Sequence, residues 1–308
     1  MNEQSGNGAT GGAGAGERPP REPTPYERAA LREIDAFKNP PPTVMSWLMS
    51  ALDVPFAKAA DKVLDTKVGD LVGRGVQGLV GLLDDGASWS VRTRAIFEEY
   101  RQAGYAVQKL DDIAGLPLER ADRVVAYVAA KYKMLALAEG AATGTAGLAG
   151  LVADVPLVVG LALRAVNEYA TYYGFDVAQP VERAVVLDVL AAGSSPTMAS
   201  RRLALAELGR VGAMYATQAA WGELEKMGGI EAVKKVAQVI GVRLSRAKLA
   251  QVVPLFGAAV GGGVNAWYMA TVTQTAYLLY RERFLMRTYG PEVGIPVRLD
   301  TPKAEVSI

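Results

Sequence analysis

The chain of 308 residues contains neither cysteine nor histidine. It therefore offers no disulfide, no thiolate nucleophile, no imidazole for acid–base catalysis and no zinc or haem site with Cys or His ligands. Carboxylate, lysine, tyrosine and hydroxyl chemistry would remain, but no catalytic motif for them is evident. We therefore expect no enzyme, no metal site and no cofactor. The missing cysteines also suit a reducing compartment, the cytoplasm.

Charge of either sign is not in excess, because 33 Lys and Arg stand against 32 Asp and Glu. A net charge of +1 gives no general affinity for nucleic acid. The chain also lacks the alternating β-branched pattern of strands. It is long enough to bury one large core. These features predict an all-α fold, a single domain of about ten helices.

The two ends of the chain differ in composition from its middle. Residues 1–24 are rich in Gly, Ala and Pro and have no apolar block, so we expect a disordered tail that is not a signal peptide. The run Thr24-Pro25-Tyr26-Glu27 predicts a capping box that starts the first helix. Residues 25–289 are the predicted helical domain, and residues 290–308 are a predicted extended tail.

Two Gly/Ala-rich stretches with almost no charge, residues 140–170 and 249–280, are predicted to form the centre of the fold. No charged residue lies between Lys248 and Arg281. We expect each stretch to be a helical hairpin wrapped by amphipathic helices. Either the hairpins are buried in a soluble protein, or they dip into a membrane with their polar sides inward.

Prolines and glycines mark the predicted hinges. In the second stretch, Pro254 and the glycines at Gly261, Gly262 and 263 predict a break between a short helix and a longer one. An offset of 98 residues aligns Pro156 with Pro254 and Asn167 with Asn265. This spacing indicates a possible internal duplication of the hairpin.

Polar residues inside these apolar stretches are the candidate functional residues. Asp154 is predicted to cap a helix that has Pro156 in its first turn. Alternatively, Asp154 is an acidic group in an apolar wall, paired with Arg164 or a cation. Asn167 and Asn265 are expected to join helices through their amides, with a polar pocket as the alternative.

The run at residues 173–176, Tyr-Gly-Phe-Asp, follows the first stretch. Gly174 suits a left-handed helix C-cap and Asp176 a turn; ligand binding is the alternative. An enzymatic alternative is carboxylate hydrolase chemistry at Asp154 and Glu168.

Several of these runs together resemble the EcsC family. They are Leu-Val-Ala-Asp-Val-Pro at 151–156, Arg164 to Glu168, Tyr173 to Asp176, Gly257 to Asn265 and the run at 281–285. The resemblance covers about residues 26–289. It implies an all-helical bacterial protein loosely tied to transport or secretion, because the family is named after the third member of a bacterial ABC-transporter operon. It implies no catalytic residues.

Basic side chains flank the second stretch on both sides. This placement is typical of a hairpin that enters an anionic cytoplasmic leaflet and returns to the same side, although a solvated helix face would look alike. The residues predicted to face a membrane or partner are Lys234, Lys235, Arg243, Arg246, Lys248, Arg281 and Arg283.

We therefore expect a non-enzymatic accessory protein at the cytoplasmic face of the membrane. Its predicted partner is membrane lipid or a membrane protein such as an ABC transporter, and not nucleic acid. The alternative is a soluble helical module that encloses a hydrophobic or lipid-like ligand between the two hairpins.

Overall fold

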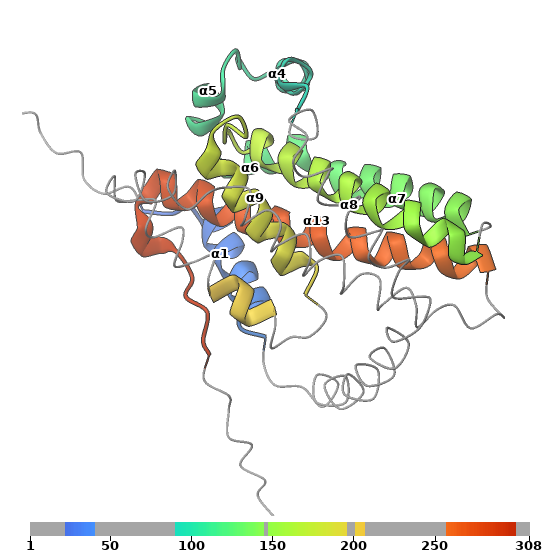
Figure 1. Cartoon of the computed structure of the whole chain (residues 1–308). Helices are drawn as coiled ribbons and strands as arrows, with labels where there is room; N and C mark the ends of the chain where they lie inside the picture. Colours follow the sequence, from blue (N-terminus) through green and yellow to red (C-terminus); the bar gives the residue numbers. More distant parts are fainter. Residues whose placement is uncertain (1–21, 41–89, 145–146, 196–200, 207–256, 300–308) are drawn as a thin grey trace, which may run out of the picture.

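The computed structural model describes residues 22–40, 90–144, 147–195, 201–206 and 257–299 (Figure 1). Within these ranges all regular structure is helical and no strand occurs, which confirms the predicted all-α fold. Eight α-helices and one 3-10 helix have defined bounds in this part of the chain. They are α1 (Pro25–Lys38), α4 (Thr93–Gln102), α5 (Leu110–Ala114), α6 (Leu118–Val125), α7 (Val128–Gly144), α8 (Gly147–Tyr172), α9 (Pro180–Gly193), α13 (Gly257–Tyr289) and η3 (Pro291–Val293).

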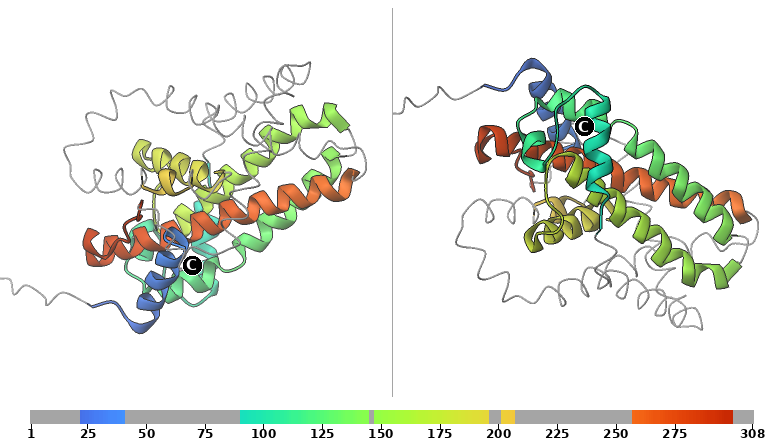
Figure 2. Two further views of the ribbon diagram at one scale, coloured as in Figure 1. Left: turned by 90° about the horizontal axis from the view of Figure 1, so that it is seen from below. Right: turned by 90° about the horizontal axis from the view of Figure 1, so that it is seen from above.

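Three long helices, α7, α8 and α13, pack against one another along their lengths and form an arm (Figures 1 and 2). The chain runs outward along α7 and returns along α8, and α13 starts at the same outer end. We call this outer end the arm tip. As predicted, the charge-poor stretches therefore supply the central helices of the fold.

The shorter helices gather around the other end of the arm (Figure 2). Among them, α9 packs closely on α13. A Cβ atom at Gly193 would lie 2.9 Å from the Cα atom of Val272, so this close approach requires glycine. The arm therefore has a covered base and a tip that extends beyond the other described helices.

The first helix begins as the sequence predicts. The Thr24 hydroxyl accepts a hydrogen bond from the Glu27 amide at 3.2 Å, and the Glu27 carboxylate accepts one from the Thr24 amide at 2.8 Å. At its other end, Lys38 forms a buried ion pair with Glu282 of α13 at 2.5 Å. The N-terminal helix is thus held against the base of the arm.

The predicted hinges within the arm are wrong. Helix α13 runs without a break through Gly261 and Gly262, and α8 runs through Pro156. A helix-interior glycine costs about 1 kcal/mol and a proline about 3 kcal/mol, and mutual packing of the arm helices outweighs both. The first hairpin turns between α7 and α8, ahead of the position predicted from Pro156. Pro254 lies outside the described residues.

Candidate functional site

A polar layer joins all three arm helices close to the tip. It consists of Glu139 and Thr143 of α7, Asp154 of α8 and Asn265 of α13. Two of its four side chains, Asp154 and Asn265, are buried, and the other two are partly buried. The Asn265 amide nitrogen donates to Glu139 at 2.6 Å and to Asp154 at 2.9 Å. The Thr143 hydroxyl donates to Asp154 at 2.5 Å. As predicted, Asn265 therefore joins helices through its side-chain amide.

Asp154 does not cap a helix, contrary to the prediction, because it lies inside α8 with Pro156 following in the same helix. Its carboxylate contacts Thr143 and Asn265 instead. Arg164 lies ten residues, about 15 Å, farther along α8 than Asp154, and its guanidinium is 3.9 Å from Glu168 instead. Asp154 thus serves as a buried hydrogen-bond acceptor that ties α8 to its two neighbours.

Large apolar side chains are exposed around the arm just behind this layer. Leu137 of α7 is 40% exposed, Leu157 of α8 is 50% exposed and Trp267 of α13 is 61% exposed. They lie within three residues of Glu139, Asp154 and Asn265, respectively. We call these three side chains the tip surface. Because each comes from a different helix of a mutually packed group, they point outward in different directions.

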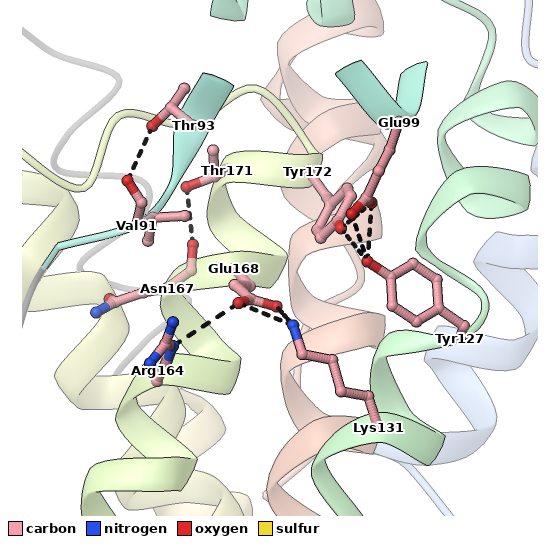
Figure 3. A network of polar contacts seen from close by, with 10 residues as sticks. All are labelled: Val91, Thr93, Glu99, Tyr127, Lys131, Arg164, Asn167, Glu168, Thr171 and Tyr172. Carbon is pink, nitrogen blue, oxygen red and sulfur yellow. Dashed lines mark hydrogen bonds and ion pairs between the residues drawn. The ribbon is translucent and has the colours of Figure 1, made fainter. Parts of the chain in front are cut away.

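A second polar network lies farther from the tip, where α4 meets α7 and α8 (Figure 3). Lys131 donates to both oxygens of Glu168, at 3.0 and 2.7 Å. Beside this pair, Tyr127 donates to Glu99 at 2.8 Å, and Tyr172 also donates to Glu99. The network fixes α4 to the α7–α8 pair, and each carboxylate in it has a donor.

Asp154 and Glu168 are separated by 14 residues of one helix. At about 1.5 Å per residue, this places them about 21 Å apart. Paired carboxylates that act on one glycosidic bond lie about 5–10 Å apart. The arrangement therefore does not suit the hydrolase chemistry considered for these residues. Asn167 is buried next to Glu168, and its backbone carbonyl accepts a hydrogen bond from Thr171.

The Tyr-Gly-Phe-Asp run forms the C-terminal end of α8. Gly174 has a φ of +76°, and the Phe175 amide donates to the Ala170 carbonyl at 2.9 Å, so the predicted left-handed cap is confirmed. Asp176 accepts a hydrogen bond from the Ala178 amide at 2.9 Å, as a turn residue does. The Tyr173 hydroxyl donates to buried Asp122 at 2.6 Å. All these contacts are structural.

Arg281 and Arg283 do not form an outward-facing basic surface, contrary to the prediction. Arg281 is 3% exposed and pairs with Asp122 at 2.9 Å. Arg283 pairs with Glu182 of α9 through two bonds of 2.5 and 2.9 Å. Both arginines follow the uncharged part of α13 and bind the helices that cover the base of the arm.

The other predicted basic residues lie outside the described residues: Lys234, Lys235, Arg243, Arg246 and Lys248. Within the described part of the chain, no group of three acidic residues is arranged to hold a metal ion. None of the helices in that part combines the length and the hydropathy needed to cross a membrane.

Two partly buried tyrosines predict how stability responds to alkaline pH. Burial first, and then the nearby carboxylate of Asp122 or Glu99, raises the pKa of Tyr26 and Tyr127 from 10.0 to about 12. Phenols in the unfolded chain ionise near pH 10, so this contribution to stability is complete below about pH 10 and is lost as the pH rises towards about 12.

Difference titrations test this expectation. The phenolate absorbance of the wild-type protein minus that of Tyr127→Phe should rise near pH 12 or together with the loss of helical circular dichroism. A difference curve with its midpoint near pH 10 in folded protein would contradict the environment described for Tyr127.

Sequence reasoning missed Glu139 and Thr143, and it missed the tip surface. One available signal was that Glu139 and Asp154 are the only charges between Lys133 and Arg164. Isolated charges in an apolar run need polar partners, and Glu139 and Asp154 both bind Asn265. Nothing comparable in the sequence predicts that Leu137 and Leu157 are exposed, because leucine is most often a core residue.

Comparisons with known proteins fit this description. Residues 28–285 match the EcsC protein family. The chain is similar to Uncharacterized protein YdbA of Bacillus subtilis (strain 168), with 24% identity over 259 residues, 83% of this chain and 92% of that protein. It is also similar to Protein EcsC of the same strain, with 28% identity over 179 residues, 58% of this chain and 70% of that protein. No solved structure matches the chain significantly.

Proposed function

The chain belongs to the EcsC protein family, and we propose that it is a docking protein that inserts the arm tip into a membrane surface. The observation behind this function is the tip surface, three large exposed apolar side chains at one level of the arm. Exposed apolar side chains at the end of a projecting element favour contact with an apolar phase.

The sequence beyond the tip surface supports insertion. No charged residue occurs in residues 140–153 or 257–266, which form or flank the outer end of the arm. From Leu137 to the end of α7 at Gly144 is seven residues, about 10 Å at 1.5 Å per residue. Interfacial helices bury their apolar face about 5–10 Å into the headgroup and acyl boundary. This part of the arm, in which Glu139 binds Asn265, therefore has the length for such shallow insertion.

The polar layer supports the same function. Its side chains hydrogen-bond to one another across the arm, which lowers the cost of bringing their polar atoms into an apolar phase. Trp267 lies next to this layer and is the most exposed member of the tip surface. Tryptophan is typical of the level where membrane and water meet. The missing cysteines favour the cytoplasmic side.

Vesicle flotation with the full chain tests this function. Wild-type protein should float with vesicles of phosphatidylcholine and phosphatidylglycerol. Leu137→Gln and Trp267→Gln should each lower the partition coefficient about tenfold, because burying one such side chain is worth about 1.5 kcal/mol or more.

Leu299→Gln is the matched control, since Leu299 is 56% exposed but belongs to the segment beside α1. This variant should float like the wild type. Two results would reject membrane docking: wild-type protein that stays at the bottom of the gradient, or tip variants that float as well as the wild type.

A further inference from the structure

Charged side chains on the arm helices differ in exposure according to their sign. Among the described residues of α7, α8 and the first 24 residues of α13, the exposed charges are Lys133 and Arg164. Asp154 and Glu168 are buried, and Glu139 is only partly exposed and binds Asn265. The arm therefore presents positive charge to its surroundings.

We infer that the arm tip selects anionic bilayers, with Lys133 and Arg164 contacting the lipid phosphates. This inference rests on the proposed docking function and names the lipid class for the same surface. It concerns residues other than the basic ones first predicted from the sequence.

The helical register places each basic residue behind an exposed leucine. Lys133 lies four residues before Leu137 on α7, and Arg164 lies seven residues after Leu157 on α8. Residues separated by four or seven positions share one face of a helix. Both basic residues lie on the side of their leucine away from the tip, about 6 and 10 Å along the helix axis. Inserting the leucines thus brings both cations to headgroup level.

Side-chain reach and local pairing favour contact with phosphate. Lysine and arginine can lay their apolar stems along a membrane surface while their charged groups stay in water. Arg164 approaches Glu168 only at 3.9 Å, whereas Lys131 makes two short hydrogen bonds to the same carboxylate. Glu168 therefore keeps a partner when Arg164 turns towards a lipid.

A bilayer suits the tip surface better than a partner protein does. Leu137, Leu157 and Trp267 come from three mutually packed helices and so surround the arm. A protein partner would cover one side of such an arrangement, whereas fluid lipid can cover all of it. A wild-type protein that binds no vesicle of any composition would overturn the choice of a bilayer.

The experiment compares vesicles of phosphatidylcholine alone with vesicles that also contain phosphatidylglycerol. Wild-type protein should prefer the anionic vesicles, and the double variant Lys133→Gln/Arg164→Gln should lose about 30-fold in affinity for them, from about 1 kcal/mol for each basic side chain near an anionic surface. Binding of this variant to neutral vesicles should stay at the wild-type level. Added salt should reduce the preference of the wild type.

The control is the double variant Lys109→Gln/Arg123→Gln, which removes the same charge from exposed positions on the other end of the molecule. It should bind anionic vesicles like the wild type. Equal loss in both double variants would overturn the assignment to Lys133 and Arg164. Equal binding of the wild type to both kinds of vesicle would overturn anionic selection while leaving docking intact, and no binding at all would reject docking itself.

Discussion

Replacing Asp122 by alanine is expected to lower the free energy of unfolding by about 3–5 kcal/mol, because it leaves a buried arginine without its main partner. Asp122 is 5% exposed and accepts hydrogen bonds from three different segments. Arg281 of α13 donates at 2.9 Å, Tyr26 of α1 at 2.8 Å and Tyr173, directly after α8, at 2.6 Å. One carboxylate of α6 therefore holds the base of the arm together.

The arginine keeps its charge in this environment. Burial alone would lower the pKa of Arg281, but the charge of Asp122 and the hydrogen bond to Glu33 raise it above its usual value. In the alanine variant the guanidinium keeps the Tyr277 ring below it and the carboxylate of Glu33, whose side chain is 56% exposed. Most of the cost thus comes from the buried cation, which loses its buried carboxylate partner, and from the two tyrosine hydroxyls that lose their acceptor.

Urea unfolding followed by circular dichroism measures this effect. Glu119→Ala is the matched control, since Glu119 lies one turn earlier on α6 and pairs with Arg123 at the surface, where such a pair is worth about 1 kcal/mol or less. Adding Arg281→Met to Asp122→Ala should recover part of the loss, because the buried cation is then gone. If the Asp122→Ala variant is as stable as the Glu119→Ala variant, the buried pair does not contribute to the free energy of unfolding.

Local signals in the sequence predicted the ends of helices well. The capping box at Thr24 and the glycine cap at Gly174 both depend on backbone groups within a few residues, so nearby sequence determines them. The central place of the charge-poor stretches also followed from composition, because uncharged helices are the ones that can be buried on several sides.

Features that depend on distant residues could not be predicted. Pro156 and Gly261 normally weaken a helix, and only packing with the other arm helices explains why α8 and α13 continue. Likewise, Arg281 looks like a solvated or lipid-facing charge until α6 supplies Asp122, a partner 159 residues away. The tip surface is the same kind of case, since its exposure depends on which helices fail to cover it.

Replacing Gly174 by alanine is expected to lower the free energy of unfolding by about 3 kcal/mol. The φ of +76° at this position costs an alanine about 1–2 kcal/mol. An added Cβ atom would also lie 2.8 Å from the Leu110 carbonyl oxygen and 3.3 Å from the Cβ atom of Ile113. Relieving such crowding requires α5 to move away from the end of α8, which costs a further 1–3 kcal/mol, roughly.

Gly104→Ala separates these two contributions. Gly104 has a φ of +86°, but no atom lies within 4 Å of the position that its Cβ atom would occupy, so only the backbone cost of about 1–2 kcal/mol applies. The difference between the denaturant midpoints of the two variants, multiplied by a common m-value, gives the difference between their free energies of unfolding. If Gly174→Ala and Gly104→Ala lower the free energy of unfolding equally, then α5 moves away from the added Cβ atom at no measurable cost. A larger loss would show that glycine is needed at position 174 for space as well as for backbone conformation.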